Sequence, residues 1–264
     1  MLGLLKDECY KLFRKRKLYL FFALLFANQL IFVFQNKVAA GSQPQSEMNG
    51  QSFPLQMLSG SSFFIALFMA VLVADMVSEE YRQGVFKAIL LHPVRRYQLV
   101  SAKAAALWIA LVAVVAFTVL AAYLLGGAFF EKGDAILVSG EPIIVHGASL
   151  GGRQGAYATA CAALGFIFAA FGFTMLVLFV SFLTRTSAVT IGVGVSLALL
   201  AKMAIGSRFL QKFFIGSFMD TLPSMIVAGA GLSDILLKVL ISAVYAAGFY
   251  GLSALLFSRQ DVLL

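Results

Sequence analysis

Charged residues are scarce in this sequence. They make up 12% of its 264 residues, about half of the share usual in a soluble domain, whereas hydrophobic residues make up 61%. The mean hydropathy is correspondingly high, at +0.93. A soluble fold would need more polar side chains to face water, and the 26 phenylalanines exclude a disordered chain. The composition therefore indicates a protein that crosses the membrane several times.

Residues that bind metals or form disulfides are also rare. The chain has two cysteines and two histidines. Cys9 lies in a basic N-terminal segment and Cys161 in an apolar run, while His92 and His146 fall in loops on opposite sides of the membrane. Side chains at different levels of a bilayer cannot reach one another. We therefore expect no disulfide and no metal site.

Motifs for nucleotide binding and catalysis are absent from the sequence. There is no Gly-x-x-x-x-Gly-Lys-[Ser/Thr], so the chain lacks the P-loop whose backbone and lysine hold ATP phosphates. His-Glu-x-x-His, Gly-x-Ser-x-Gly and Cys-x-x-Cys do not occur either. We expect no catalytic residue and no bound cofactor in this chain. If ATP drives the protein, a second chain must hydrolyse it.

Six long apolar runs are present instead. They are Leu18–Phe34, Gln56–Val77, Ala104–Leu125, Tyr157–Leu183, Ser187–Ile205 and Ile235–Phe257. Backbone groups in lipid must be hydrogen-bonded within the protein, so continuously apolar runs predict helices rather than the alternating strands of a barrel. The sequence therefore predicts an all-α integral membrane protein, with residues 1–264 forming a single domain of six transmembrane helices.

The distribution of basic residues favours one orientation. With the N-terminus in the cytoplasm, 13 Lys and Arg residues fall in cytoplasmic segments and 5 in outer loops. We predict a multi-pass protein of the plasma membrane with both termini cytoplasmic, whose first span is retained rather than cleaved as a signal peptide. The net charge of +8 then indicates contact with the lipid bilayer surface and not with nucleic acid.

The N-terminal segment, residues 1–17, has the pattern of an amphipathic helix. Leu5 and Leu12 belong to an apolar stripe with Phe13 beside it, and Lys11 points in another direction. Such a helix can lie in the cytoplasmic interface before the chain enters the bilayer. Two interpretations remain open. The helix is either an anchor that only sets topology or a docking surface for a cytoplasmic partner.

The cytoplasmic loop 78–103 predicts a second short amphipathic helix. Ser78 is placed to cap it, and two glutamates follow in its first turn, where negative charge is favoured. Apolar residues recur along one face until Pro93 ends the helix. Arg95, Arg96 and Lys103 then lead into the third span, where we expect them to reach lipid phosphates. We favour a contact surface over a solvated connector, because a passive loop would not need so many large apolar residues.

Charges within the spans are few. We place Asp75, Lys202 and the pair Asp234 and Lys238 near the ends of spans, where they can pair or extend to the interface. None of them predicts a buried relay at mid-depth. This argues against a proton-coupled carrier.

The fourth apolar run carries small residues at helical spacing. A stripe of this kind lets another helix approach closely, and packing within the chain is more typical of it than a substrate surface. The stripe consists of Ala158, Ala162, Gly165, Ala169 and Gly172. The short turn 184–186 predicts that the fourth and fifth spans form a tight helical hairpin.

The cytoplasmic loop resembles that of permeases of the type-2 ATP-binding-cassette (ABC) family. Glu80-Tyr81-Arg82-Gln83-Gly84-Val85-Phe86-Lys87, Leu90-Leu91-His92-Pro93-Val94-Arg95-Arg96 and Lys103 follow its pattern of an acidic residue, Gly-Thr, a Leu pair, Pro-x-x-Arg and Lys. Val85 stands where that family commonly has Thr. The start, Glu8-x-x-Lys11-Leu12-Phe13-Arg14, and the tail, Phe257-Ser258-Arg259-Gln260-Asp261, are similar to the ends of that family.

This resemblance implies a complex of several chains. It implies two permease subunits, as a second copy or a related permease, and two cytoplasmic ABC ATPase subunits, which would hold ATP and Mg. The loop would act as a coupling helix, with the N-terminal helix adding to the ATPase contact. Part of the outer loop 206–234 would form short helices that dip toward the membrane. The implied coupling residues are Glu79, Glu80, Tyr81, Gly84, Val85, Phe86, Ile89, Leu90, Pro93, Arg95 and Arg96, with Leu5, Glu8, Lys11, Leu12 and Phe13 from the N-terminal helix.

Three functions follow as hypotheses. The first is the membrane subunit of an ABC exporter of an amphipathic substrate, such as an antimicrobial peptide or a drug. The second is a secondary carrier or channel that needs no ATPase. The third is a membrane assembly factor that transports nothing.

Overall fold

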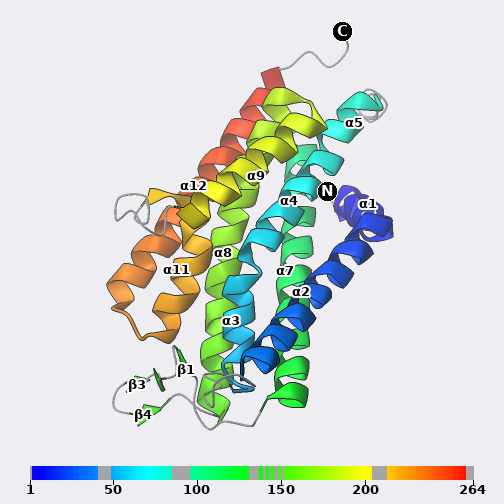
Figure 1. The fold of residues 1–264 in the computed structure, drawn as a ribbon. Coiled ribbons are helices and arrows are strands. Elements are labelled where there is room, and N and C mark those ends of the chain that lie inside the picture. The colour runs from blue at the N-terminus through cyan, green and yellow to red at the C-terminus, as the bar shows by residue number, and fades with distance from the viewer. Residues whose placement is uncertain are drawn as a thin grey trace.

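The computed structural model is a bundle of helices (Figure 1). It describes residues 2–40, 49–84, 96–130, 137–138, 141–142, 144–145, 148–149, 152–203 and 213–259. The helices are α1 (Leu2–Arg14), α2 (Arg16–Ala40), α3 (Phe53–Gly60), α4 (Ser62–Met76), α5 (Ser78–Arg82), α7 (Arg96–Phe129), α8 (Gly152–Thr184), α9 (Ser187–Met203), α11 (Ile215–Val227) and α12 (Leu232–Arg259).

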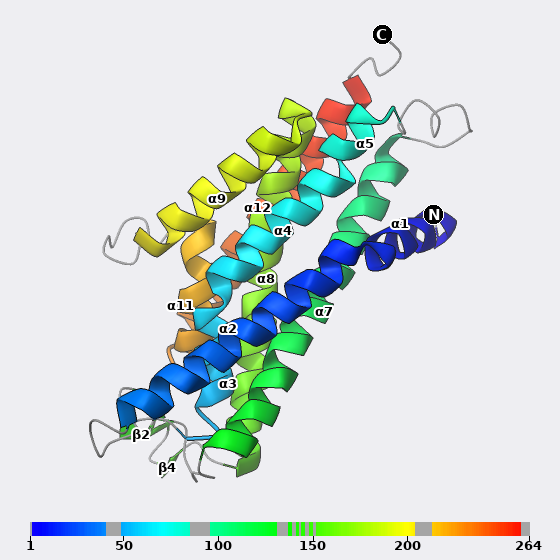
Figure 2. The same cartoon turned by 45° about the vertical axis from the view of Figure 1, so that its right-hand side comes forward.

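Two short antiparallel hairpins complete the described residues. Strand β1 (Leu137–Val138) pairs with β2 (Glu141–Pro142), and β3 (Ile144–Val145) pairs with β4 (Ala148–Ser149). Both lie at one end of the bundle, which we call the hairpin end, and α5 and the last turn of α12 lie at the other, which we call the α5 end (Figures 1 and 2).

Five of the described helical segments are long and apolar enough to cross a membrane. They are Arg16–Lys37, Ser62–Arg82, Arg96–Phe129, Gly152–Thr184 and Leu232–Arg259. Each overlaps one of the predicted apolar runs. The remaining run, Ser187–Ile205, corresponds to α9, which has 17 residues and is shorter than these. The second run is also not one continuous helix, because Ser61 separates α3 from α4.

Helix α8 lies at the centre of the bundle and packs against α11, α12, α4 and α7. The small-residue stripe faces these neighbours. A Cβ atom on Gly165 would lie 2.6 Å from Cδ1 of Ile226 in α11, and one on Gly172 would lie 3.1 Å from the carbonyl oxygen of Ser242 in α12. The helices approach so closely because these positions carry no side chain.

Helix α11 falls within the segment 206–234 that the sequence analysis treats as an outer loop. It packs along α8, and Ile215, Phe218 and Leu222 are fully buried. It is therefore part of the helical core. Of its polar residues, Ser217 is buried, Asp220 and Thr221 are half-buried and Ser224 is exposed. Residues 206–212 of this segment lie outside the described residues.

The turn between α8 and α9 is as short as the sequence indicates. Arg185 adopts a positive φ of 55° and the chain reverses over two residues. Helix α9 then packs mainly against α4 rather than against α8, its neighbour in sequence. Gly194 makes this possible, because a Cβ atom there would lie only 2.5 Å from Cβ of Ala70. Figure 2 shows α9 diverging from α8 after the turn.

Candidate functional site

Three segments that are distant in sequence meet near the α5 end: α1, α5 and the first turns of α7. Helix α1 packs against α7 through its apolar stripe, and Leu12 is almost completely buried. This is the amphipathic pattern that the sequence analysis identified, and its buried side lies against the rest of the chain.

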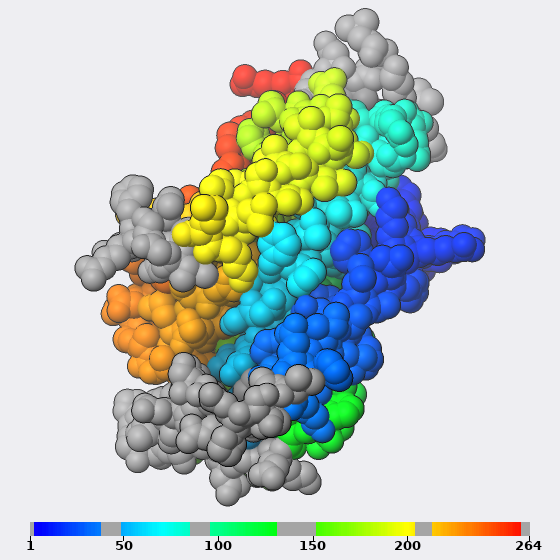
Figure 3. All heavy atoms as spheres, in the orientation of Figure 1, coloured from blue at the N-terminus to red at the C-terminus, as the bar shows by residue number. Residues whose placement is uncertain are grey.

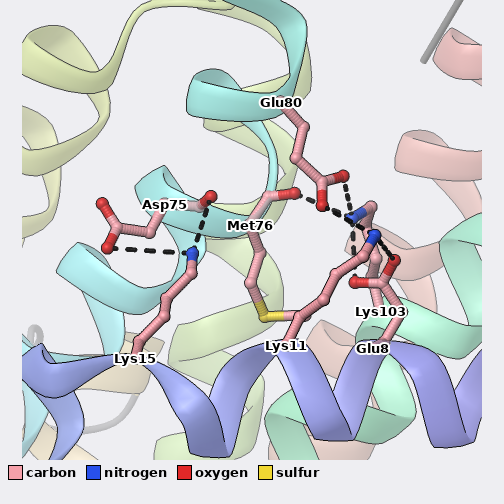
Figure 4. Close-up of polar contacts among 7 residues, drawn as sticks. All are labelled: Glu8, Lys11, Lys15, Asp75, Met76, Glu80 and Lys103. Atoms are coloured by element: carbon pink, nitrogen blue, oxygen red, sulfur yellow. Dashed lines mark hydrogen bonds and ion pairs between the residues drawn. The ribbon is translucent and has the colours of Figure 1, made fainter. Parts of the chain in front are cut away.

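Lys103 of α7 stands at the centre of this junction and is fully buried. Its ammonium group donates to Oε2 of Glu8 at 3.0 Å, to Oε2 of Glu80 at 2.5 Å and to the carbonyl oxygen of Met76 at 2.8 Å (Figure 4). A lysine ammonium has three donors, so all three are used. The prediction that Lys103 extends to lipid phosphates is therefore wrong.

Lys11 closes the cluster from the outside. Its Nζ lies 3.4 Å from Oε1 of Glu8 and 3.3 Å from Oε1 of Glu80, so each carboxylate bridges two lysines. We call Glu8, Lys11, Glu80 and Lys103 the Lys103 cluster. Positive and negative charges alternate around it, which is the arrangement that offsets the desolvation of buried ions.

A second contact ties the start of α2 to the end of α4. Lys17 lies 2.9 Å from the Asp75 carboxylate, and Lys15 donates to the carbonyl oxygen of Asp75 at 3.2 Å. The pairing predicted for Asp75 is present, with partners from the N-terminal segment. The corner between α1 and α2 is thus held to α4 and α5 on both sides.

The local electrostatics follow from burial and from these carboxylates. Burial opposes the charged form of Lys11, but the Glu8 and Glu80 carboxylates outweigh it and raise the pKa of Lys11. Burial lowers the pKa of Lys15 despite the nearby Asp75 carboxylate. Burial also raises the pKa of the Cys9 thiol, and the adjacent Glu8 carboxylate raises it further.

Helix α5 is attached to the core by its first residues. The Ser78 hydroxyl lies 2.8 Å from that of Ser181 and 3.2 Å from that of Thr190, so it does not cap the helix, and Val77 occupies the N-cap position. The prediction of a serine cap is wrong because the hydroxyl finds partners on α8 and α9. The Tyr81 ring packs edge-on against Phe182 and Phe257.

The other predicted coupling residues are only partly described. Glu79 is near the surface and pairs with Arg82 at 2.6 Å, and Gly84 ends the described segment with a positive φ of 69°. Arg96 donates to the carbonyl oxygens of Phe257 and Ser258 at the end of α12, a role that replaces the predicted lipid contact. Val85, Phe86, Ile89, Leu90, Pro93 and Arg95 lie outside the described residues.

A second group of polar and charged residues joins α4, α9 and α11, and the sequence analysis identified only Lys202 of its members. Lys202 of α9 donates to both carboxylate oxygens of Asp220 in α11, at 3.0 and 2.9 Å, and to the Ser62 hydroxyl at 2.6 Å. Asp220 also accepts from Ser62 at 2.6 Å. We call these three residues the Lys202 cluster. The sequence did carry one indication of this cluster. Lys202 is a lone lysine near the end of an apolar run, and such a lysine needs a carboxylate partner.

Lys238 also has a partner other than the one expected. Its ammonium group donates to the Thr221 hydroxyl at 2.8 Å and lies over the Phe218 ring, rather than forming the predicted pair with Asp234. Both contacts come from α11, the helix that was taken for an outer loop.

Within the part of the chain that the structure describes, no group of three or more His, Cys, Asp and Glu residues is placed to hold a metal ion. The acidic residues of the Lys103 cluster face lysines instead. The site therefore consists of ion pairs between helices, which join α1 and α5 to the start of α7.

Comparison with known proteins identifies the family. No curated protein matches the chain. A family model described as ABC-2 family transporter protein matches residues 4–201, which is well over half of the 264 residues and includes Glu8, Glu80 and Lys103. With its five candidate spans, the chain therefore belongs to the ABC-2 family of transporter proteins and is a multi-pass membrane transport permease.

Proposed function

We propose that the chain is the membrane-spanning subunit of an ABC exporter that moves an amphipathic substrate out of the cytoplasm. ATP and Mg would be bound and ATP hydrolysed by two separate cytoplasmic ATPase subunits. A second permease, either another copy of this chain or a related one, would complete the pathway. Family membership supports this proposal, and because the sequence contains no P-loop motif we assign ATP hydrolysis to a separate chain.

The Lys103 cluster is the observation that carries the proposal. A helix that contacts a cytoplasmic partner can tilt a membrane span only if that helix and the span are rigidly joined. Glu8 and Glu80 bind the same buried ammonium group, which belongs to α7. A force on either α1 or α5 therefore acts on the start of α7, a 34-residue helix that runs through the bundle.

The orientation and the number of spans complete the proposal. The α5 end faces the cytoplasm, as the excess of basic residues there favours, and both termini lie on that side of the plasma membrane. Helix α9 acts as the remaining span together with α11, which continues beside α8 after the intervening residues. Helix α1 lies in the membrane interface, with Leu5, Leu12 and Phe13 toward the bundle.

In the resulting mechanism, ATP binding closes the ATPase dimer and moves α1 and the loop 78–103 together. Because α7 is clamped to both, the spans shift between inward-facing and outward-facing arrangements. The free energy for the shift is the difference between the affinities of the ATPases for ATP in the two arrangements.

Co-purification with candidate ABC ATPases tests the assembly. We expect a stable complex and vanadate-sensitive ATP hydrolysis that the substrate stimulates. Failure to find any associating ATPase, together with substrate flux through vesicles that contain this chain alone, would favour the carrier hypothesis instead. A stable complex with neither hydrolysis nor flux would favour an assembly factor.

A matched pair of variants tests coupling. Phe86→Ala removes an aromatic side chain from the predicted coupling loop, and Phe129→Ala removes one from the end of α7 at the hairpin end. We expect Phe86→Ala to lower transport per ATP hydrolysed while membrane insertion stays normal, and Phe129→Ala to leave this ratio unchanged. Equal ratios in both variants would contradict a coupling role for the loop.

A further inference from the structure

A cleft of about 800 Å³ opens at the corner between α1 and α2. Helices α4 and α5 form its other wall, and Figure 3 shows α1 projecting from the bundle beside α5. The charged residues that line it are Glu8, Lys11, Arg14, Lys15, Arg16, Lys17, Asp75, Glu79, Glu80 and Arg82. The cleft therefore lies where a membrane-spanning helix begins, which is the level of the lipid headgroups.

Most of these charges are already paired. Lys11 pairs with Glu8 and Glu80. Lys15 and Lys17 share Asp75, and Arg82 pairs with Glu79.

Two cations of the cleft remain. Arg14 and Arg16 are exposed and lie beyond ion-pair distance of every carboxylate in the described part of the chain. Arg14 has no carboxylate within ion-pair distance there, but its Nη1 donates to the Tyr10 hydroxyl oxygen at 3.0 Å. Two guanidinium groups that line one cleft without a carboxylate partner are suited to bind a phosphate, because each presents several donors in one plane.

An uncovered apolar surface continues from this corner. Tyr19 is 62% exposed, Leu20 59% and Leu24 52%, and all three belong to α2 just beyond the basic residues. The apolar part of α2 is largely uncovered by the rest of the chain. A ligand that fits both features has a phosphate at one end and a hydrocarbon chain at the other.

We propose that the cleft is a binding site for an anionic phospholipid. The phosphate contacts Arg14 and Arg16, and an acyl chain lies along the exposed face of α2. Anionic lipids are attracted to basic residues next to a membrane span, and each such residue contributes about fivefold to affinity. The site would then hold the α1–α2 corner in the interface. Only the choice of leaflet rests on the orientation proposed above.

The test uses the purified full chain in detergent, without any ATPase. The chain is incubated with mixed micelles of phosphatidylglycerol and phosphatidylcholine, and bound lipid is measured by native mass spectrometry. We expect preferential retention of phosphatidylglycerol. The double variant Arg14→Gln with Arg16→Gln should weaken this binding about thirtyfold, because two basic contacts are lost.

A second double variant controls for net charge. Arg153→Gln with Arg259→Gln removes the same amount of charge from the start of α8 and the end of α12, and both residues are exposed. We expect it to retain phosphatidylglycerol normally. Circular dichroism checks that both double variants keep their helix content. Equal losses in the two, or no loss in either, would overturn the proposal.

Two further measurements distinguish a lipid headgroup from a free anion as the ligand of the cleft. Inorganic phosphate and glycerophosphoglycerol carry the charge without an acyl chain, and we expect each to compete weakly. Leu20→Ser should lower the affinity for phosphatidylglycerol but not for these soluble anions. If phosphate binds as tightly as the lipid does, the cleft is a site for free anions and the lipid proposal is wrong. If lipid retention is unaffected while Arg14→Gln with Arg16→Gln abolishes association with an ATPase, the cleft is a protein contact.

Discussion

The Lys103 and Lys202 clusters are both ion pairs between helices, but they differ in what they join and how deeply they are buried. Lys103 is fully buried and holds two carboxylates, from α1 and α5. The Lys202 side chain is 36% exposed and holds a single carboxylate, from α11. The first joins residues 8, 80 and 103, all within the matched family region 4–201, whereas Asp220 lies outside that region.

This difference indicates different roles. A lysine that is completely withdrawn from solvent and saturated by three acceptors cannot exchange its partners without a large cost in free energy. A half-exposed one-to-one pair can be broken more easily, since water can replace each partner. We infer that the Lys103 cluster is a permanent joint, and that the Lys202 cluster is a contact that can open when α9 and α11 move.

The largest effect is expected for Lys103→Met. The substitution removes the buried cation between Glu8 and Glu80 and leaves them only Lys11, whose side chain is 44% exposed. Breaking a buried pair in this way costs about 3–5 kcal/mol. The free energy of unfolding in a single detergent, measured by denaturant titration, should fall by this amount. Further substitution of both glutamates by glutamine should recover part of the loss, because two negative charges that share the single cation Lys11 are then removed. No recovery would mean that lost packing, rather than charge, accounts for the effect.

The matched substitution at the other cluster, Lys202→Met, should cost less. Asp220 keeps the hydrogen bond from the Ser62 hydroxyl and lies at a partly exposed position. We expect a loss of about 1–3 kcal/mol, the range for one hydrogen bond to a charged group. The same titration measures it. A loss as large as that of Lys103→Met would remove the distinction between a fixed joint and a contact that opens.

Two glycines of α9 sharpen the comparison further, since they lie two residues apart on one helix. Gly194→Ala places a Cβ atom against Ala70, whose short side chain cannot move aside, and we expect a loss of about 1–2 kcal/mol. Gly192→Ala meets nothing within 4 Å and should stabilise the helix by about 0.5–1 kcal/mol. Thermal unfolding of both variants measures the difference. Equal midpoints would show that α9 does not pack on α4 in this manner.

Much of the fold was predictable from the sequence, because continuous apolar runs have one structural solution in lipid. The runs located the five candidate spans, and the pattern of residues 1–17 predicted α1. The break at Ser61 was missed, although the cluster Ser59-Gly60-Ser61-Ser62 interrupts the apolar run at that point. Helix α11 lies in the segment 206–234, where the resemblance implied short helices, but its packing along α8 was not predicted. Its buried residues are interspersed with polar ones, and its role depends on which helix it meets.

The sequence identified the segments that form the site, but not the contacts between their residues. The sequence analysis selected Glu8, Lys11 and Glu80 as contact residues, and the structure brings them to one point. The role of Lys103 was missed because a lysine at the start of a span usually extends toward lipid, and only the fold supplies two carboxylates to it. Ser78 was misjudged in the same way, since its partners on α8 and α9 are about a hundred residues away.

The smallest expected effect concerns the reactivity of Cys9, which reports whether α1 is docked. Burial and the Glu8 carboxylate both raise the pKa of its thiol, so a smaller fraction is thiolate at a given pH than in an exposed cysteine. In a Cys161→Ser background, where Cys9 is the one remaining cysteine of the sequence, we expect slow alkylation by a maleimide at pH 8. The rate should rise with a midpoint at higher pH than that of an unstructured peptide containing residues 1–17.

Glu8→Gln separates the two causes of this shift. It removes the negative charge beside the thiol but leaves burial, so the midpoint should move partway toward the peptide value. Lys103→Met should move it further if α1 leaves α7, because burial is then lost as well. The pH profile of alkylation thus distinguishes a docked helix with an altered charge from a released one. If the Cys161→Ser protein, with no other substitution, is alkylated with the same pH midpoint as the peptide, then α1 is not docked on α7. The contrast between the two clusters would then have no basis.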